Sequence, residues 1–396
     1  MDKSTTVSFP AAPLATYRIE SLAKVMTPAL AIYVDVVDSN IQTTLGLLDG
    51  KPERWRPHVK TTKLAAIMAR LIANGISNFK CATTLELLTV CETGARDVVV
   101  AYPCLGARAR RIQQIASIFP DVRISVLLEN ESDVDVWRGT RVGAFVDVNP
   151  GMNRTGIEEN HLQEIVSLAQ SIQRAGISFR GIHYYDGQRY ESDLAERTTL
   201  AHRGYDQLLR VVGALKSHSI ATEEVITSGT PAFPCALSYP GFQNAGFIHR
   251  MSPGTLVYGD TTSLCQLPNA WDYQPAALVI STVVSHPEND LITCDAGHKT
   301  VSADSGIPNC AILGHPELIP LRPSEEHLPI RVESGYPIPR RGDTLYLVPR
   351  HVCPTVNNFD HCLMISQGRI TGIETVTARG REAPITVDGA GDLGLG

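Results

Sequence analysis

The stretch that decides the fold is GAFVDVNPGMNRTGIEENHLQEIVSLAQSIQRAGISFRGIHYYDG, residues 143–187. It begins with one short apolar run (143–148) and ends with another (179–185). Between them, residues 160–176 place apolar side chains every three or four positions and end at Gly176, which is typical of a helix and its stop. A strand, a helix and a second strand in this order predict two parallel strands joined by a crossover helix.

The same alternation extends from residue 28 to about residue 260. Strands buried on both faces read as continuous apolar runs, and the sequence holds eight such runs. They are PALAIYVDV (28–36), RPHVK (56–60), NFKCA (78–82), DVVVAYP (97–103), RISVLLE (123–129), GAFVDV (143–148), FRGIHYY (179–185) and EEVITSG (223–229). Eight strand–helix units predict a (β/α)₈ barrel. An open doubly wound sheet is the alternative, but it usually has a glycine-rich loop after its first strand, and the DVVDSN that follows here has no glycine.

The sequence pattern changes after about residue 270, where the alternation of strands and helices ends. Short β-branched runs separated by turns, such as AALVISTVVSHP and GDTLYLVPRHVCPTV, predict an all-β domain. We therefore divide the sequence into an N-terminal extension (1–27), a barrel (28–265), a C-terminal β domain (266–385) and a flexible tail (386–396).

Composition narrows the class of protein. The length of 396 residues suits a barrel of roughly 250 residues with a smaller domain. A net charge of −6 gives no sign of a nucleic-acid partner, and the sequence has neither a membrane-spanning apolar run nor a secretory signal pattern. Nine cysteines, an odd number without a CxxC pair, are expected to be reduced thiols. We expect a cytoplasmic enzyme that binds neither nucleic acid nor membranes.

Polar side chains gather at the predicted C-terminal ends of the barrel strands, where such barrels carry their functional groups. These residues are Lys60, Asn153, Arg154, His183, Tyr185, Asp186 and the SGTP turn at 228–231. In that turn Gly229 allows close backbone approach and Thr230 adds a hydroxyl, so it could cradle a phosphate or be a plain turn.

Lys60 could be an ordinary salt-bridging lysine or a reactive amine. In a barrel mouth, partial desolvation and the neighbouring cations Arg56, His58 and Lys63 would lower its pKa and favour the free amine that forms a Schiff base. A phosphate cradle together with such a lysine indicates pyridoxal phosphate (PLP).

His351 and Cys353 follow the predicted strand DTLYLV and point to the same side of an extended chain. Imidazole and thiolate suit zinc, and two protein ligands would leave positions open for water or substrate. The alternative is a buried cysteine beside a surface histidine. The SEEH segment (324–327) could orient these ligands from behind or could be a solvated turn.

Taken in order, the motifs resemble those of the D-threonine aldolase/D-serine dehydratase-like proteins, PLP enzymes with an alanine-racemase-like barrel and a C-terminal β domain. The resemblance spans roughly residues 26–382 and rests on RPHVKTTK, FKCAT, DVNPGMNRTG, GIHYYDG, SGTP, SPGTLVYGD, DAGHKTVSAD, SEEH and VPRHVCPTVN.

The resemblance implies a role for each of these sites. Lys60 would be the Schiff-base lysine, Arg154 would lie beside the phenolate oxygen of PLP, and Gly229 and Thr230 would hold its phosphate. His183 would face the ring, near Tyr185. His351 and Cys353 would bind a divalent metal, zinc or manganese, that coordinates the β-hydroxyl of a D-amino acid. A homodimer is also implied.

The reaction stays open between two lyase chemistries and a racemase. An aldolase would break the Cα–Cβ bond to give glycine and an aldehyde, whereas a dehydratase would release a 2-oxo acid and ammonia. His58, His183 and the released Lys60 are the candidate proton acceptors. The motifs favour the aldolase, while the thiolate ligand favours a zinc-dependent dehydratase. A racemase would need no metal. Two departures concern the reaction: Thr62 and His183 stand where many family members have other residues.

Overall fold

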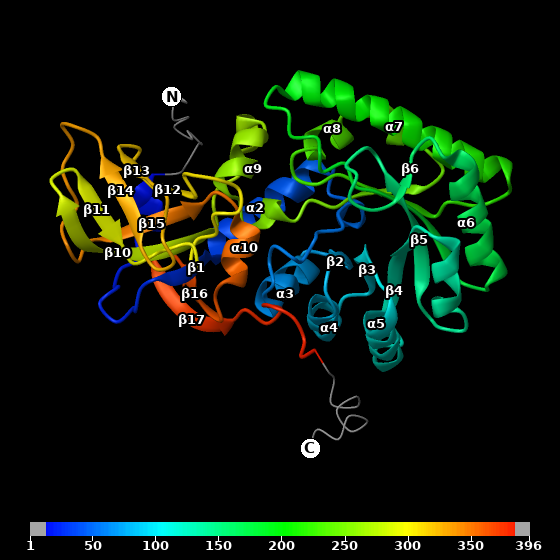
Figure 1. Ribbon diagram of the computed structural model, residues 1–396, viewed down its shortest axis with the longest axis horizontal. Coiled ribbons are helices and arrows are strands. Elements are labelled where there is room, and N and C mark those ends of the chain that lie inside the picture. The colour runs from blue at the N-terminus through cyan, green and yellow to red at the C-terminus, as the bar shows by residue number, and fades with distance from the viewer. Residues whose placement is uncertain (1–12, 385–396) are drawn as a thin grey trace, which may run out of the picture.

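The structure is a computed structural model that describes residues 13–384. It consists of a barrel lobe with helices around it and a β domain beside it (Figure 1). Residues 1–12, part of the predicted N-terminal extension, and the predicted tail at 386–396 lie outside the described residues. No helix of residues 13–384 combines the length and apolarity that crossing a bilayer requires.

The barrel lobe is built on a curled parallel sheet. Within the described residues its strands follow the order β2-β3-β4-β5-β7-β8-β9, and the short β6 pairs with β5. Their bounds are β2 (Asn78–Cys81), β3 (Asp97–Pro103), β4 (Arg123–Leu128), β5 (Gly143–Asn149), β6 (Ile157–Glu158), β7 (Phe179–Tyr184), β8 (Glu224–Thr227) and β9 (Ile248–Met251). Residues 55–58 bridge the two edges of this sheet, because Trp55 pairs with Met251 of β9 and His58 with Lys80 of β2. The predicted barrel with its C-terminal β domain is therefore confirmed.

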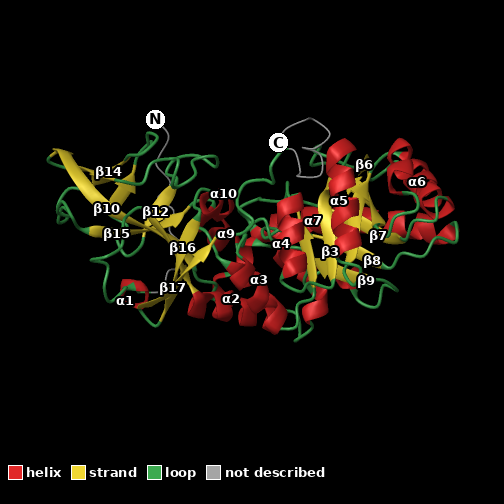
Figure 2. Cartoon of the chain, turned by 90° about the horizontal axis from the view of Figure 1, so that it is seen from below, coloured by secondary structure: helices red, strands yellow, loops and turns green. Residues whose placement is uncertain are grey.

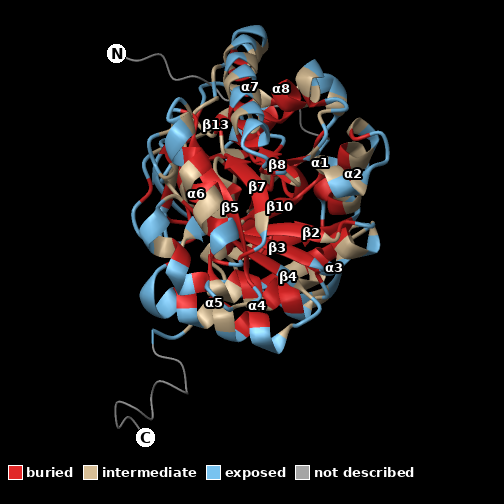
Figure 3. Cartoon of the chain, turned by 90° about the vertical axis from the view of Figure 1, so that its right-hand side faces the viewer, coloured by how far each residue is buried: buried red, intermediate tan, exposed pale blue. Residues whose placement is uncertain are grey.

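Helices cover the outside of this sheet, and Figure 3 shows its buried strands behind them. Their bounds are α2 (Val34–Leu47), α3 (Ala65–Ala73), α4 (Thr84–Glu92), α5 (Gly106–Ile118), α6 (Leu162–Arg174), α7 (Leu194–Ser217) and α8 (Phe233–Leu237). In α6, the helix predicted from residues 160–176, the apolar stripe is buried: Ile165, Val166, Leu168, Ala169 and Ile172. Shorter helices are α1 (Leu14–Tyr17), α9 (Thr261–Gln266) and α10 (Val352–Asn357).

The β domain is a mostly antiparallel sheet (Figure 2). Its strands are β10 (Ala277–Glu288), β11 (Leu291–Cys294), β12 (Cys310–Ile312), β13 (Leu318–Pro320), β14 (Leu328–Val332), β15 (Thr344–Pro349), β16 (His361–Ser366) and β17 (Arg369–Thr375). The sheet also contains β1 (Ala29–Tyr33), which pairs antiparallel with β10 and parallel with β16.

The prediction that residues 28–36 form the first barrel strand is therefore wrong. Only residues 29–33 are extended, and α2 begins at Val34. An apolar run indicates burial on both faces but not the sheet that buries it, and here the partners are β10 and β16. Strand β9 was not predicted, because its sequence IHRM contains two basic side chains and so lacks the expected apolar run.

The inside of the barrel is layered because alternate residues of each strand point inward. Near the N-terminal ends of the strands lies a buried ionic layer of Arg56, Asp97, Arg180, Glu224 and Arg250. Above it lies an apolar layer of Val99, Leu127, Phe145 and Ile226. Nearer the C-terminal ends, buried polar side chains return: Lys80, Asp147, His183 and Ser252. The candidate site begins at this polar layer.

Candidate active site

Lys60 follows the segment that closes the barrel. Val59 donates its amide to the Lys80 carbonyl at 2.8 Å, and Lys80 donates back to Pro57 at 3.0 Å, so the segment is tied to the edge of the sheet at β2. The strand predicted over residues 56–60 is reduced to isolated bridges at Trp55 and His58, followed by a turn. Lys60 then stands in a turn at the mouth of the barrel and is partly exposed. This position agrees with the sequence prediction.

Arg56 and Lys63, two of the three cations expected to lower the pKa of Lys60, each have a carboxylate partner. Arg56 donates from Nε to Glu224 Oε1 at 2.8 Å in the ionic layer. Lys63 donates from Nζ to Glu86 Oε1 at 2.8 Å and to the Ala378 carbonyl. Both positive charges are thus paired with carboxylates, and a role for either side chain in tuning Lys60 stays a prediction.

His58 does lie beside Lys60. Its Nδ1 accepts the Lys60 amide at 3.3 Å, so in this arrangement Nε2 carries the ring proton. Burial, together with the positive charges of Lys60 and Lys80, holds the pKa of His58 well below its usual range. His58 is thus a neutral imidazole that presents an N–H donor.

Lys80 also lies in this site, although its place in the site was not predicted from the sequence. It is 1% exposed, and its Nζ donates to Ser252 Oγ at 2.6 Å and lies 3.3 Å from His183 Nε2. Burial and the charges of Lys60 and Arg154 hold its pKa well below the usual range. The available signal was a lysine inside NFKCA, a run otherwise read as a doubly buried strand.

His183 has hydrogen-bond partners at both ring nitrogens. Nδ1 lies 2.7 Å from Asp147 Oδ1, and Nε2 faces Lys80. Burial and Lys80 lower its pKa although Asp147 opposes the shift. In this arrangement His183 fixes Lys80, and taking a proton from a substrate would require that contact to open.

Tyr185 joins the other predicted cofactor residues. Its ring stacks on His183, with centroids 6.5 Å apart and planes 8° from parallel. The guanidinium carbon of Arg154 lies 4.9 Å from the Tyr185 ring centroid. A Cβ added at Gly229 would come within 3.0 Å of Tyr185 Oη, so the phenol packs directly on the SGTP turn.

The SGTP turn has the features expected of an anion cradle. Ser228 adopts a left-handed φ of 54°, and its carbonyl accepts the Ser252 amide at 3.2 Å. The Oγ1 of Thr230 is buried and has no hydrogen-bond partner among the described residues. A buried hydroxyl without a partner is uncommon and is expected to meet a ligand or water. The residues present therefore fit the phosphate of PLP.

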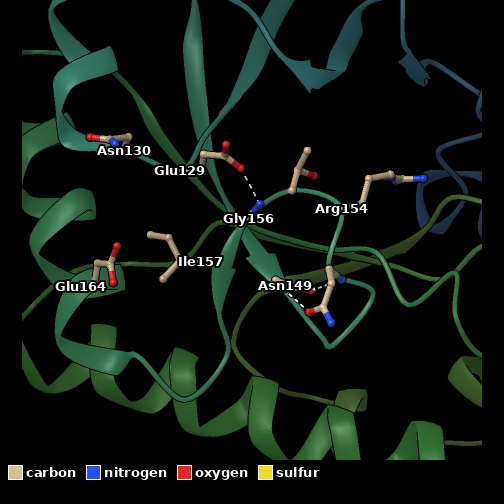
Figure 4. Close-up of a pocket in the computed structure, with 9 residues that line it drawn as sticks. Glu129, Asn130, Asn149, Arg154, Gly156, Ile157 and Glu164 are labelled. Carbon is tan, nitrogen blue, oxygen red and sulfur yellow. Dashed lines mark hydrogen bonds between the residues drawn. The ribbon is translucent and has the colours of Figure 1, made fainter.

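An open polar pocket of about 420 Å³ is lined by residues of the 149–157 loop together with Glu129, Asn130 and Glu164. In Figure 4 the carboxylate of Glu129 turns to the Gly156 amide, while Arg154 extends away from Glu129 and Glu164. Arg154 therefore lines this pocket and also contacts the Tyr185 ring.

His351 and Cys353 lie together at the start of α10, on the barrel side of the β domain. His351 Nδ1 lies 2.8 Å from Asp304 Oδ2. Burial would lower the pKa of His351, but the Cys353 thiol and Asp304 raise it to about 9. Burial would raise the pKa of Cys353, but the hydrogen bond and charge of His351 and the charge of Lys60 bring it below its usual value.

This pair has an open side and a carboxylate behind it. Because Asp304 takes Nδ1, Nε2 of His351 is the atom left for a metal, with the carboxylate orienting the ring. The described residues hold no cluster of three or more His, Cys, Asp or Glu side chains placed to bind a metal. The suggested role for SEEH is wrong: Glu325 and Glu326 pair with Lys299, at 2.6 and 3.2 Å.

Asp186 is a further buried acid. The sequence places it at a strand end, but no function was predicted for it. It is 2% exposed, Tyr205 donates to its Oδ2 at 2.6 Å, and its Oδ1 has no partner among the described residues. Burial raises its pKa to about 6. Thr62, one of the departures from the family pattern, is also buried, and its carbonyl accepts the Tyr258 hydroxyl at 3.0 Å.

Comparison with known proteins agrees with this geometry. The family model described as "Alanine racemase, N-terminal domain" matches residues 32–262, and the one described as "Putative serine dehydratase domain" matches residues 276–365. The chain is 29% identical over 382 residues to a D-threonine aldolase of an Arthrobacter species, covering 91% of this chain and 94% of that protein.

Two further likenesses bear on the reaction. The chain is 22% identical over 371 residues to D-threo-3-hydroxyaspartate dehydratase of a Delftia species, covering 86% of this chain and 94% of that protein. The solved structure of D-threonine aldolase from Filomicrobium marinum has a TM-score of 0.83 at 28% identity and covers 91% of this chain and 97% of that one. The barrel, the lysine turn and the family match over residues 32–262 show that this chain belongs to the alanine racemase N-terminal domain family, and a D-serine dehydratase-like domain follows the barrel.

Proposed function

We propose that this PLP-dependent lyase of D-β-hydroxy-α-amino acids catalyses retro-aldol cleavage to glycine and an aldehyde, assisted by a divalent metal at His351 and Cys353. The lyase class follows from the family and the relatives, which are aldolases and a dehydratase. The bond that is cleaved, the substrate and the metal are the proposal.

The observation that carries the proposal is the contact between the two candidate sites. Cys353 Sγ lies 3.1 Å from Thr61 Oγ1, and Thr61 is the residue after Lys60. A β-hydroxy-α-amino acid carries its amino and hydroxyl groups on adjacent carbons, so the groups that bind them must be neighbours. The amine of Lys60 and the metal pair meet this requirement.

Each residue then has a stated task. Lys60 attaches PLP, which supplies an electron sink when bound. Gly229 and Thr230 hold the phosphate, and Arg154 lies where a phenolate oxygen can be bound. His58 presents its N–H beside Lys60, and the amine of Lys60 is the candidate proton acceptor.

The metal site fits a borderline-soft ion such as zinc. The chemistry of the donor set, an imidazole nitrogen and a thiolate whose pKa is lowered, is what zinc prefers, and manganese is the second candidate. A metal held there would act as a Lewis acid on the substrate hydroxyl.

A dehydratase is the second candidate function. The thiolate ligand favours it, and so does the dehydratase relative. Against it stand the higher identity to a D-threonine aldolase and the likeness to the solved aldolase. A homodimer and a cytoplasmic location remain predictions.

The test is a product assay with purified holoenzyme. D-threonine and D-serine are supplied separately, with L-threonine as the control, and glycine, aldehyde, 2-oxo acid and ammonia are measured. Glycine and acetaldehyde from D-threonine alone support the aldolase. A 2-oxo acid with ammonia supports the dehydratase, and racemised substrate without cleavage contradicts both.

A further inference from the structure

The segment that follows β17 returns from the β domain to the barrel, and we call its residues 376–382 the C-terminal strap. In Figure 1 it is the red chain that leaves β17 and passes beneath α3. The strap contains neither helix nor strand, yet Val376 and Ala378 are 2% and 0% exposed. Buried irregular backbone needs hydrogen-bond partners, and those of the strap lie on two elements of the candidate site. These elements are the turn that holds Lys60 and the helix α10.

The strap binds the lysine turn at Lys63. The Lys63 amide donates to the Val59 carbonyl at 3.0 Å and closes the turn that contains Lys60. Lys63 thereby adopts a left-handed φ of 53°, which is strained for a residue other than glycine. Contacts to the strap oppose this strain, because the Ala378 amide donates to the Lys63 carbonyl at 2.9 Å and the Ala378 carbonyl accepts Lys63 Nζ at 3.1 Å. The conformation of the lysine turn therefore depends on the strap.

Two further contacts fix this end of the strap. The Ala65 amide at the start of α3 donates to Thr377 Oγ1 at 3.0 Å. Lys63 is 5% exposed, and its Nζ pairs with Glu86 Oε1 at 2.8 Å while it also donates to the strap. A buried ammonium whose partners are a carboxylate and a carbonyl is held in one place. The strap is thus bonded to both the backbone and the side chain at the end of the lysine turn.

The strap binds α10 at its last residue, Asn357. Gly380 donates its amide to Asn357 Oδ1 at 2.9 Å, and Arg379 donates from Nε to the Asn357 carbonyl at 3.1 Å. The second bond satisfies one of the carbonyls that have no partner within a helix at its C-terminal end. The other end of α10 carries His351 and Cys353, so the strap holds this short helix from the end opposite to the proposed metal pair.

We propose that the C-terminal strap positions the lysine turn and α10 against each other, with Asn357 and Thr377 as the positioning residues. Ala378 is bonded to one element and Gly380 to the other. These two strap residues are separated by one residue, so about 7 Å of chain joins the elements. A displacement of either element is therefore passed to the other through the strap.

The consequence for catalysis rests on the proposed function, in which the lysine turn and the metal pair bind adjacent groups of one substrate. Their contact is the 3.1 Å approach of Cys353 Sγ to Thr61 Oγ1, and the strap is bonded to the elements on both sides of it. The start of α10 has its own support, because Asp260 Oδ2 accepts the Val352 amide at 3.0 Å. Loss of one strap hydrogen bond should therefore loosen the site without unfolding the protein.

The experiment is hydrogen exchange, measured by mass spectrometry on the full-length, cofactor-free protein. Asn357→Ala removes the acceptor of the Gly380 amide at the end of α10. Exchange in peptide 60–66 should become about fivefold faster, the factor that corresponds to the loss of one hydrogen bond, although Asn357 does not bond to this peptide. Asn357→Asp keeps the acceptor and should restore the parent rate. Asn358→Ala is the matched control: its side chain binds the Thr300 carbonyl, so peptide 60–66 should keep the parent rate.

The parent rate of peptide 60–66 in Asn357→Ala, or an equal change in Asn358→Ala, overturns the inference. The reciprocal variant is Thr377→Val, which removes the acceptor of the Ala65 amide and should speed exchange in peptide 351–358. Should Asn357→Ala not fold, as judged by circular dichroism, this second variant decides. Faster exchange in peptide 351–358 then supports the inference, and the parent rate overturns it.

The holoenzyme gives a second measurement. Because each half of the site is intact in Asn357→Ala, this variant should keep the Schiff-base absorbance and the metal content of the parent protein. Its kcat/KM for D-threonine should fall about tenfold, because the two halves are no longer held at a fixed spacing. A parent-like kcat/KM beside faster exchange overturns the positioning role. If the parent protein does not cleave D-threonine, the proposed function fails, and the exchange rates still decide whether the strap joins the two elements.

Discussion

The thiol of Cys353 lies 3.1 Å from the hydroxyl of Thr61, so the β domain touches the barrel at the residue next to Lys60. These residues are far apart in sequence, and neither domain alone contains the complete site. Thr255, which follows the barrel strand β9, also approaches Cys353 Sγ, at 4.0 Å. The site is therefore a junction of two domains, and its residues can be tested one at a time.

Replacing Cys353 with alanine should remove the softer of the two proposed metal ligands. We expect metal bound after dialysis to be lost and lyase activity to fall at least about 100-fold, because a single imidazole cannot hold the ion. Metal content by elemental analysis and product formation are the measurements. Cys265→Ala changes an exposed cysteine and serves as the control. Full metal content in Cys353→Ala would contradict the assignment.

Replacing Asp304 with asparagine tests the carboxylate behind His351. The carboxylate lies 2.8 Å from His351 Nδ1 and holds the ring so that Nε2 faces outward. Loss of such a support typically weakens metal binding by about 10–100-fold. A chelator-competition titration measures the change, with Glu325→Gln as the matched control, because Glu325 pairs with Lys299 instead. Equal affinities in the two variants would exclude this role for Asp304.

Replacing Lys60 with alanine should abolish the visible absorbance of the Schiff base in PLP-reconstituted protein. Lys80 is the second amine at the barrel mouth, but it is 1% exposed and bonded to Ser252, so it should not substitute. Borohydride reduction followed by peptide mass mapping identifies the labelled lysine. A label on Lys80 in the unmodified protein would show that the Schiff base forms on Lys80, and would contradict its assignment to Lys60.

The segment RPHVK (56–60) shows which features of the site can be predicted from the sequence and which cannot. Its place in the barrel was predicted from its position between the apolar run at 28–36 and the helix that follows it, and Lys60 is partly exposed at the end of the segment. The sequence does not show that Arg56 faces Glu224 while His58 lies beside Lys60. These positions depend on which residues of the segment point into the barrel, and pairing with β2 and β9 decides that.

The partners of metal-pair and cofactor residues were harder to predict. His351 and Cys353 are recognisable as ligand types, but Asp304, not SEEH, lies behind them, because the folding of the β domain brings residues 304 and 351 together. Lys80 was hidden for a different reason: one polar residue in an apolar strand is usually read as an interruption. Its partners are His183 of β7 and Ser252, which directly follows β9.

Replacing Glu224 with glutamine should destabilise the ionic layer of the barrel. Glu224 is fully buried and bonds to Arg56, Arg180 and Arg250, so its loss leaves buried arginines undercompensated. We expect the free energy of unfolding to drop by about 3–5 kcal/mol. Asp135→Asn breaks an exposed pair with Arg138 outside this layer and should cost less than about 1 kcal/mol. Urea unfolding measures the free energy of unfolding of both variants. Equal decreases would contradict a stabilising role for the ionic layer.

Replacing Asp186 with asparagine should change the pH dependence of stability. The folded-state pKa of Asp186 is raised from 3.8 to about 6 by burial. Protonated Asp186 therefore favours the folded state below pH 4, and this contribution is lost as the pH rises to about 6 and beyond. Because asparagine does not titrate, the stability of the variant relative to the parent should rise between pH 4 and pH 7 by about 2–3 kcal/mol.

A second variant separates this effect from a change in packing. The hydroxyl of Tyr205 donates to Asp186 Oδ2 and lowers the carboxyl pKa, so Tyr205→Phe should move the transition to higher pH. Urea unfolding of the cofactor-free protein at several pH values from 4 to 8 gives both results. A stability difference between Asp186→Asn and the parent that stays constant over this range would show that Asp186 does not titrate there. In that case the carboxyl would already be ionised at pH 4, and its buried, unpartnered Oδ1 would need a compensating charge close by.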